Sequence, residues 1–382
     1  MKILLLGEYS RLHNSLKEGL EQLNHDVTIA GTSDYFKNYP TDILFKTKYT
    51  SGVLGLIRKL IFKLSGVDIT SLDLKKQFQN KQTELENYDI VQLINECPIN
   101  TVPKIEGQLL DFIFKANKNV FLLSCGTDHI SVKYAADGHF KYSVLTPYEQ
   151  NRGSKKDFWH VIMYLTAPYE KHHKFVYKNI RGVIATDFDY HIPLEGHPKY
   201  LGFIPNPINV EKLKFSKLDF SSKLVIFHGI NSSNYYKKGN DIFEQALDLL
   251  SEESKLKVEI ITVRSLPYIK YIETFNRAHI VLDQVFSYDQ GYNALEAMAK
   301  GKVVFTGAET PWLSHFNLEA DTVAINAEPN AKVIASKLES LINNPEQLQT
   351  ISNNARAFIE REHNYIKIAE TYLKVWNSSL KS

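Results

Sequence analysis

The stretch IVLDQVFSYDQGYNALEAMAKGKVVFT, residues 280–306, decides the fold. An apolar run at 280–283 is followed by a polar loop, and a short helical pattern begins after Asp289 and Gly291. A glycine ends that pattern, and a second apolar run occupies 303–306. Two buried strands joined by one helix form a βαβ unit, so this stretch predicts a parallel sheet.

The helix of this unit opens at the carboxyl edge of the predicted sheet. Free backbone N–H groups and the positive end of the helix dipole favour a phosphate there. Gly291 lets the backbone approach such a group closely, and the amides of Tyr292 and Asn293 follow it. Glu296, about one turn into the helix, is placed to accept hydrogen bonds from vicinal sugar hydroxyls. The pattern therefore predicts a site for a nucleoside diphosphate.

The segment GYNALEAMAKGKVV, residues 291–304, resembles the donor-nucleotide motif of retaining GT-B glycosyltransferases. In that family a glycine precedes the helix and a Glu grips the ribose, which implies these roles for Gly291 and Glu296. The family usually has a second Glu eight positions earlier, near the transferred sugar, where this chain has Tyr288. Asp289, or Asp283 with Gln284, could take part of that role. The alternative is that the segment is only an amphipathic helix of the core.

Composition indicates an ordinary globular protein large enough for two domains. The chain has 382 residues, of which 43% are hydrophobic and 23% charged, and its net charge is +2. That charge gives no case for nucleic acid as a partner. The cysteines, Cys97 and Cys125, form no disulfide framework, and no apolar run reaches the roughly 20 residues that span a bilayer. We therefore expect a cytoplasmic location, with any membrane contact peripheral and at the inner face.

Strand and helix patterns alternate through both halves of the chain, which predicts two doubly wound parallel sheets. The expected strands are residues 2–6, 26–30, 89–94, 119–124, 183–186 and 200–204 in the first half, and 223–227, 257–263, 280–283, 303–306 and 322–325 in the second.

A proline-rich segment, FIPNPIN at 203–209, marks the predicted domain boundary. Two prolines hold an extended path that ends one strand without starting a helix, and the resembling family has a similar linker. We expect an N-terminal Rossmann-like domain at 1–206 that binds the acceptor and a C-terminal Rossmann-like domain at 207–363 that binds the nucleotide sugar. The resemblance implies that the final helix, 364–382, packs back on the first domain and that the two domains face a cleft.

Three residues of the first half are candidates at that cleft. Gly7 follows the first strand, and the resemblance implies contact with the acceptor or the donor phosphates; a plain turn is the alternative. Asp128 and His129 follow the strand at 119–124 and are candidate catalytic residues, because the family often has a sugar-binding histidine near this point. Alternatively, Asp128 only caps the next helix.

The second half contains a second predicted phosphate site after its first strand. Gly229 is expected at the strand end, and Lys238 at a helix start. In the resembling family the corresponding Lys neutralises the donor diphosphate, so Lys238 is a candidate for both binding and catalysis. The family's arginine five residues earlier is Ser233 here, and Arg264 is the candidate replacement.

Two further patterns bear on metal and cofactor binding. Asp187-Phe188-Asp189 spells the triplet with which glycosyltransferases of another fold hold a divalent ion, but the surrounding pattern is doubly wound, so we predict no metal site. After the first strand only Gly7 of a dinucleotide fingerprint is present, so we predict no NAD and no other cofactor.

Two basic, apolar segments are candidate membrane contacts. Residues 52–66, GVLGLIRKLIFKLSG, have the pattern of an amphipathic basic helix. Residues 154–178 mix aromatic side chains with lysines and histidines. Either segment could rest on anionic lipid or extend the acceptor surface, although ordinary domain helices look the same.

Taken together, the resemblance implies a metal-independent glycosyltransferase of the hexosyltransferase type. It would move a sugar, with retention, from a UDP- or GDP-type nucleotide sugar to a glycan or lipid-linked acceptor in cell-surface polysaccharide or lipopolysaccharide synthesis. Two alternatives remain open. One is a nucleotide-sugar epimerase or hydrolase of the same fold, which needs no acceptor. The other is a non-catalytic binding subunit, which Tyr288 and Ser233 favour.

Overall fold

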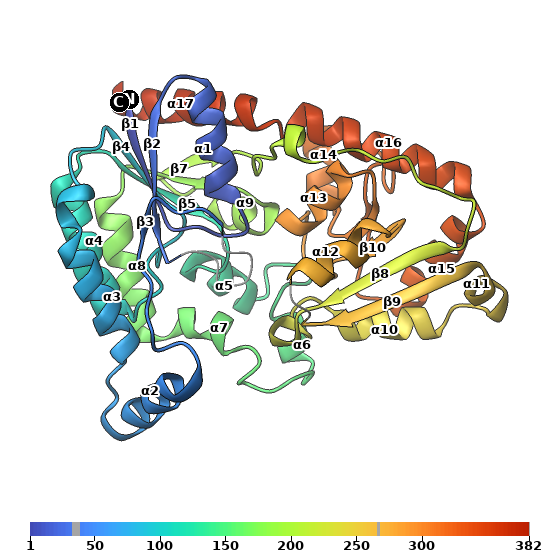
Figure 1. Cartoon of the computed structure of the whole chain (residues 1–382), viewed down its shortest axis with the longest axis horizontal. Coiled ribbons are helices and arrows are strands. Elements are labelled where there is room, and N and C mark those ends of the chain that lie inside the picture. The colour runs from blue at the N-terminus through green and yellow to red at the C-terminus, as the bar shows by residue number, and fades with distance from the viewer. Residues whose placement is uncertain (33–38, 266–267, 382) are drawn as a thin grey trace.

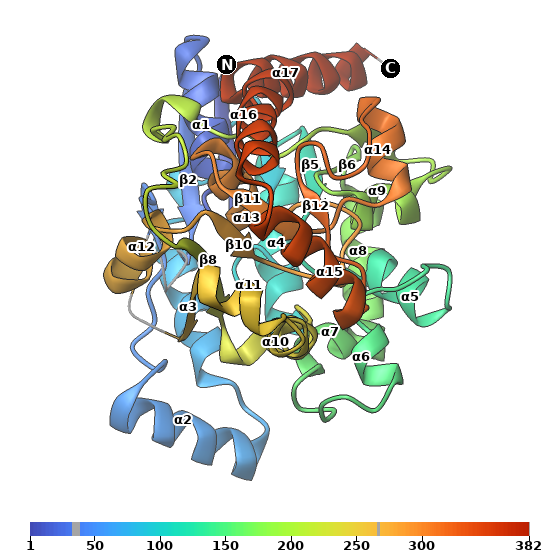
Figure 2. The ribbon, with the colours of Figure 1, turned by 90° about the vertical axis from the view of Figure 1, so that its right-hand side faces the viewer.

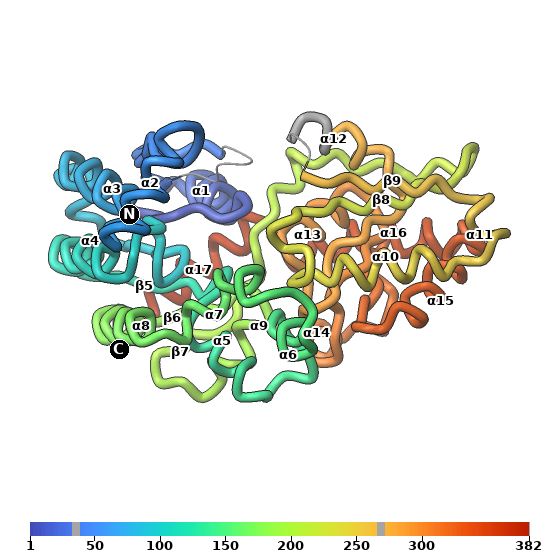
Figure 3. The backbone as a smooth tube through the Cα atoms, turned by 90° about the horizontal axis from the view of Figure 1, so that it is seen from below, coloured from blue at the N-terminus to red at the C-terminus, as the bar shows by residue number. Residues whose placement is uncertain are grey.

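The computed structural model of the chain describes residues 1–32, 39–265 and 268–381. It has two lobes, each built on one parallel sheet with helices on its faces (Figure 1). The prediction of two doubly wound α/β sheets is therefore confirmed. Figure 3 views the same arrangement from below, with the lobes side by side and linked by a few segments of chain.

The N-terminal lobe carries seven strands in the order β3-β2-β1-β4-β5-β6-β7. These strands are β1 (Lys2–Leu6), β2 (Asp26–Gly31), β3 (Ile43–Leu44), β4 (Ile90–Leu93), β5 (Val120–Ser124), β6 (Val183–Ala185) and β7 (Tyr200–Phe203). Its helices are α1 (Leu12–Gln22), α2 (Gly52–Ser65), α3 (Ile69–Asn80), α4 (Pro103–Ala116), α5 (His129–Ala136), α6 (Thr146–Glu149), α7 (Trp159–Ile162), α8 (Ala167–Asn179) and α9 (Phe188–Leu194).

The C-terminal lobe carries five strands in the order β12-β11-β10-β8-β9. They are β8 (Leu224–Ile230), β9 (Val258–Arg264), β10 (Ile280–Leu282), β11 (Val303–Thr306) and β12 (Ile325–Asn326). The helices that follow the linker are α10 (Asn240–Asp248), α11 (Glu252–Lys257), α12 (Tyr268–Asn276), α13 (Tyr292–Ala299), α14 (Thr310–Phe316), α15 (Ala331–Ile342), α16 (Pro345–Glu362) and α17 (Tyr365–Lys381).

The central strands are apolar runs rather than alternating patterns, because helices cover both faces of each sheet. Four of the five residues of β1 are fully buried, as are all residues of β5, β10 and β11. The strand order reverses between β1 and β4 in the first sheet and between β8 and β10 in the second. In open parallel sheets, ligands bind at such switch points beyond the carboxyl ends of the strands.

The linker between the lobes and the segment that leads into α17 lie side by side. The predicted boundary at 206/207 falls between β7 and β8, the last and first strands of the two sheets. The backbone N–H of Ile208 donates to the carbonyl of His363 at 2.7 Å, and the Nδ1 of His363 lies 2.8 Å from the carbonyl oxygen of Asn206. The residues that lead into α17 thus return beside the linker.

Helix α17 packs on α1 of the N-terminal lobe, across the top of the molecule in Figure 1. Trp376 anchors it: the side chain is fully buried and its Nε1–H donates to the Oε1 of Gln92 on β4 at 3.1 Å. The ring also packs against Phe121 of β5. The last helix of the chain is therefore part of the N-terminal core.

Helix α2 differs from the other helices of this lobe because it projects from the body (Figures 1 and 2). Its bounds agree with the predicted basic helix at 52–66, but Gly55 is its only buried residue. The second predicted contact segment, 154–178, is divided: residues 154–157 are exposed, whereas α8 packs on α4 and buries His172 and Val176.

Candidate active site

A cleft of about 620 Å³ lies between the lobes, at the carboxyl edges of both sheets. From the C-terminal lobe it is lined by Asn234, Lys237, Lys238, Gln284, Phe286, Ser287, Asp289, Gly291, Tyr292 and Asn293. From the N-terminal lobe the loop after β1 contributes Tyr9 and Ser10, and the loop after β5 contributes Gly126 and Thr127. Both switch points of the fold therefore face the same cavity.

Lys238 and the start of α13 meet in this cleft through Asp283. The Lys238 Nζ donates to the Oδ1 of Asp283 at 2.9 Å, and the Nδ2 of Asn293 donates to the same oxygen at 3.3 Å. Asp283 follows β10 and is 4% exposed, whereas the Lys238 side chain is 31% exposed. Asp283 therefore links Lys238 to the N-terminal end of α13 at the β8–β10 switch point.

Gly291 is the N-cap of α13 and lines the cleft, as does Gln284, whose amide lies 3.6 Å from where a Cβ on Gly291 would stand. No side chain caps the helix at Gly291, and the first amides of a helix are the groups that bind anions at such a position. Gly291 and Lys238 therefore line the same cleft.

Tyr292, predicted to bind substrate, also joins the lobes. Its hydroxyl lies 2.5 Å from the Oγ of Ser15 on α1 and donates to the carbonyl of Pro207 at 2.8 Å. Because both partners belong to the N-terminal lobe or the linker, the first residue of α13 is held against the hinge. Glu296, further along α13, is half-buried but is not among the residues that line the cleft, so its predicted contact with a ribose stays a prediction.

Lys237 is a cleft residue that the sequence reasoning did not select. It lines both the main cleft and a neighbouring pocket. Burial and, to a smaller extent, the adjacent Lys238 lower the pKa of its ammonium group to about 8, while Asp189 opposes the shift. The pair Lys237-Lys238 was visible in the sequence, but nothing in it indicated that both cations would face one cavity.

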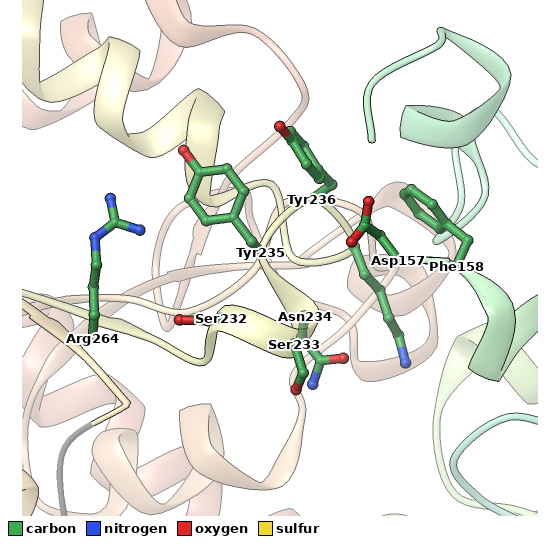
Figure 4. Close-up of a pocket in the computed structure, with 9 residues that line it drawn as sticks. Asp157, Phe158, Ser232, Ser233, Asn234, Tyr235, Tyr236 and Arg264 are labelled. Carbon is green, nitrogen blue, oxygen red and sulfur yellow. The ribbon is translucent and has the colours of Figure 1, made fainter. Parts of the chain in front are cut away.

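Arg264 lies in that neighbouring pocket, which has a volume of about 250 Å³. Figure 4 shows Arg264 beside Tyr235, with Ser232 and Ser233 on the strand-loop segment below. The guanidinium pairs with Glu244 and lies over the Tyr235 ring, 5.4 Å from its centroid. Arg264 and Ser233 thus share one pocket, and Asn234 and Lys237 belong to both this pocket and the main cleft.

Gly229, Asp128, His129 and Gly7 are also predicted site residues that are not among those lining the cleft. The prediction that Gly229 ends its strand is wrong, because β8 continues to Ile230 and Gly229 pairs with Val263 of β9. Asp128 caps α5: its Oδ1 accepts from the N–H of Ser131 at 2.8 Å, and its Oδ2 accepts from the Ser124 hydroxyl. The structure therefore favours the capping alternative for Asp128.

His129 packs against α8 and the short helix at residues 163–165. Its Nδ1 lies 2.8 Å from the carbonyl oxygen of Tyr164, and its ring stacks on His173 at 4.7 Å between centroids. Gly7, with φ +90, sits where strand ends crowd, and an added Cβ would lie 2.2 Å from the Cγ2 of Ile94. The catalytic role of His129 and the substrate-binding role of Gly7 stay predictions.

Tyr288 stands where the resembling family usually has a Glu. In this structure its side chain contacts residues of the N-terminal lobe. Its hydroxyl accepts from the backbone N–H of Lys141 at 2.9 Å, and its ring packs on Phe140 at 5.1 Å between centroids. Nearby, the Tyr142 hydroxyl and the Lys141 ammonium reach Glu309 of the C-terminal lobe. Tyr288 therefore fastens residues 140–142 of the first lobe onto the second.

Three carboxylates meet where the lobes touch, and all three line the cleft: Asp289 is buried, and Asp187 and Asp189 are partly buried. Asp289 accepts from the N–H of Phe188 at 2.8 Å, while Asp189 accepts from the Ser287 hydroxyl at 2.5 Å. Asp187 accepts from the Nδ2 of Asn206 at 2.9 Å. Burial raises the pKa values of Asp187, Asp189 and Asp289, and the neighbouring carboxylates add to the shift for Asp189 and Asp289.

No group of three or more His, Cys, Asp or Glu side chains positioned to hold a metal ion occurs within residues 1–32, 39–265 and 268–381.

The raised pKa values predict that stability falls as pH rises toward neutral. An unfolded Asp has a pKa near 3.9, so the native state keeps protons that the unfolded state releases, and their contribution disappears as pH rises through the higher native pKa values. Asp289→Asn removes one charge and keeps an acceptor for Phe188. We expect the drop in unfolding free energy between pH 5 and pH 8 to shrink by about 1–3 kcal/mol, measured by urea denaturation at each pH.

The matched control is Asp248→Asn, at the exposed end of α10. Its pH profile should overlay that of the wild type. A pH profile of Asp289→Asn that also overlays the wild type would contradict the electrostatic description of this cluster.

The chain is similar to a protein family and to solved structures. Residues 240–374 match the protein-family model described as "Glycosyl transferase-like". No curated protein matches the sequence significantly.

Several solved structures are similar over the whole chain. The Anabaena protein Alr3699/HepE, solved in complex with UDP and glucose, is 15% identical with a TM-score of 0.58, covering 99% of this chain and 100% of that one. Sucrose-phosphate synthase (tll1590) from Thermosynechococcus elongatus is 13% identical with a TM-score of 0.60, covering 100% of both chains. WaaG, a glycosyltransferase involved in lipopolysaccharide biosynthesis, is 15% identical with a TM-score of 0.54, covering 97% of this chain and 98% of that one. The chain therefore has the GT-B fold of glycosyltransferases, and residues 240–374 match a glycosyl transferase-like family.

Proposed function

We propose that this protein is a glycosyltransferase that moves a sugar from a nucleotide sugar to a glycan or lipid-linked acceptor. The C-terminal lobe binds the donor and the N-terminal lobe the acceptor. One observation carries the proposal: Lys238 and the open mouth of α13 at Gly291 line the same cleft at the switch point between β8 and β10. That arrangement suits a diphosphate, which is the leaving group of such a reaction.

The comparisons support a uridine donor. The family match at 240–374 begins at the start of α10 and includes α13. Structures of Alr3699/HepE are in complex with UDP and with UDP-glucose. We propose a UDP-type donor first and a GDP-type donor second.

In the proposed reaction, negative charge develops on the leaving diphosphate. The Lys238 ammonium and the first amides of α13 would stabilise that charge without a metal ion, and Lys237 would add a second cation. At pH 7 Lys237 is mostly protonated because its pKa is about 8. The diphosphate would draw Lys238 away from Asp283, which holds this lysine in place while the cleft is empty.

We further propose that the anomeric configuration is retained and that the leaving phosphate accepts the proton of the acceptor hydroxyl. No protein base is then needed. The polar groups of the N-terminal lobe that face the cleft, such as Ser10, Asn95 and Thr127, would orient the acceptor. Contacts across the hinge at Tyr292 and Tyr288 would keep the lobes closed and limit hydrolysis.

A screen of thermal stability against nucleoside diphosphates and nucleotide sugars tests the proposal. UDP or GDP at about 100 times its dissociation constant should stabilise the protein by about 2.7 kcal/mol, while AMP should not. Donor turnover should then depend on an added acceptor extract. Rapid turnover of the donor alone would favour the epimerase or hydrolase alternative.

The non-catalytic alternative makes a different prediction from the same screen. Tyr288 fastens the lobes instead of facing the sugar, which is the observation in favour of a binding subunit. In that case the nucleotide would bind and no acceptor would yield product. There would be no turnover for Lys238→Ala to lower. Absence of stabilisation by any nucleotide would contradict both the transferase and the binding subunit.

A further inference from the structure

The most exposed apolar surface of the described chain lies on helix α2. Five large side chains of this helix are each more than half exposed: Val53 by 72%, Leu56 by 65%, Leu60 by 57%, Phe62 by 54% and Leu64 by 77%. Such exposure on a helix that projects from the body is unusual, because apolar side chains of this size are normally buried. These exposed side chains of α2 indicate a surface that a partner covers.

Val53, Leu56, Leu60 and Leu64 form one stripe. At about 100° per residue, they lie within an arc of about 80° on the helix. Phe62, on the opposite side, is exposed as well. The stripe is therefore open to solvent along a helix that projects from the body, as Figures 1 and 2 show for the helix as a whole.

Cations border the stripe, and acids are absent from it. On the same helical projection Lys59 and Lys63 fall next to the apolar arc, and both are exposed. Residues 43–67 contain Lys46, Lys48 and Arg58 in addition, and no Asp or Glu. A convex apolar stripe edged by lysines complements an anionic, flat surface with an apolar interior, because lysine stems can lie along that surface while their ammonium groups stay in water.

A second element lies at the same end of the molecule. The connection between α6 and α7 reaches toward the end from which α2 projects (Figures 1 and 2). It includes the exposed Lys155 and Lys156, and Trp159, at the start of α7, is 49% exposed. Lysines with an exposed tryptophan are typical of a membrane interface. The other side of this segment borders the cleft through His160 and Tyr164.

We propose that α2 inserts its apolar stripe into the surface of a bilayer containing anionic lipid, with the α6–α7 connection as a second contact. This would place the cleft wall formed by His160 and Tyr164 next to the lipid surface, where a lipid-linked acceptor is anchored. Within residues 1–32, 39–265 and 268–381, no helix is long and apolar enough to span a membrane. The proposed contact is peripheral and does not depend on the donor or on catalysis.

Flotation with lipid vesicles tests the proposal on the full chain. We expect at least about tenfold more binding to phosphatidylcholine vesicles with about 30% phosphatidylglycerol than to phosphatidylcholine alone. Leu56→Ser/Leu60→Ser/Leu64→Ser should lower the binding to anionic vesicles at least about tenfold. Lys59→Glu/Lys63→Glu should remove the preference for anionic vesicles.

The matched control is Leu256→Ser on α11, because Leu256 is 73% exposed and lies on the other lobe. It should bind vesicles like the wild type. The thermal shift with UDP serves as a separate measure of folding and donor binding, and it should be the same in all variants, so failure of the donor-binding proposal is seen independently.

Two outcomes would overturn the inference. One is vesicle binding that is absent in the wild type or unchanged in the triple serine variant. The other is a wild-type dimer in analytical ultracentrifugation that the triple serine variant converts to a monomer without any vesicle binding, since α2 would then be covered by a second copy of the chain.

Discussion

Replacing Lys238 with alanine is expected to lower kcat/KM for the donor about 100- to 1000-fold. The ammonium group is the cation proposed to meet the leaving diphosphate, and its loss also leaves Asp283 without its ion pair. Asp283 is only 4% exposed, so its charge would face the incoming diphosphate from a poorly solvated position. Steady-state kinetics with the donor identified in the nucleotide screen measures the effect.

A double variant separates the two causes. In Lys238→Ala/Asp283→Asn neither position 238 nor position 283 carries a charge, so nucleotide binding should recover in part. The kcat should stay low, because no cation is restored. Lys214→Ala, an exposed lysine of the linker, is the matched control and should leave both parameters unchanged. Activity of Lys238→Ala within threefold of the wild type would contradict the assigned role.

Replacing Trp376 with alanine is expected to lower the free energy of unfolding by about 3–5 kcal/mol. The indole is fully buried between α17 and the first sheet, against Phe121 and Tyr372. Its removal leaves a large cavity and deprives the Oε1 of Gln92 of its donor. Urea denaturation followed by circular dichroism measures the loss.

Trp159→Ala provides the comparison, because this tryptophan is 49% exposed. Its effect should stay within about 0.5 kcal/mol, as expected for surface substitutions. A loss below 1 kcal/mol in Trp376→Ala would mean that α17 is not a structural part of the N-terminal lobe.

The layout of both sheets could be predicted because local patterns and tertiary packing agree. Buried parallel strands are continuous apolar runs, and prolines and glycines mark their ends, so β1, β5 and β11 could be found from the sequence alone. The helix bounds of α2 and α13 were predictable for the same reason. Strands such as β3, which has two residues, carry too little pattern to be found.

The site was less predictable, because one local pattern serves several purposes. A strand followed by Asp and His is typical of a catalytic loop and also of a helix cap. For Asp128 the contacts to Ser124 and Ser131 favour the helix cap, and these contacts could not be predicted from the sequence. The exposure of α2 was equally hidden, since an amphipathic pattern does not say which face is covered. Tyr288 shows a third limit: its partners are about 150 residues away in the chain, at Phe140 and Lys141.

A crystal structure of the protein with UDP tests the proposed donor site most directly. We expect the diphosphate to lie between the Lys238 ammonium and the amides at the start of α13, at hydrogen-bond distances of about 2.7–3.1 Å, with the Lys238–Asp283 pair lengthened. A diphosphate bound in the Arg264 pocket, or anywhere else without contact to Lys238 and Gly291–Asn293, would contradict the proposal.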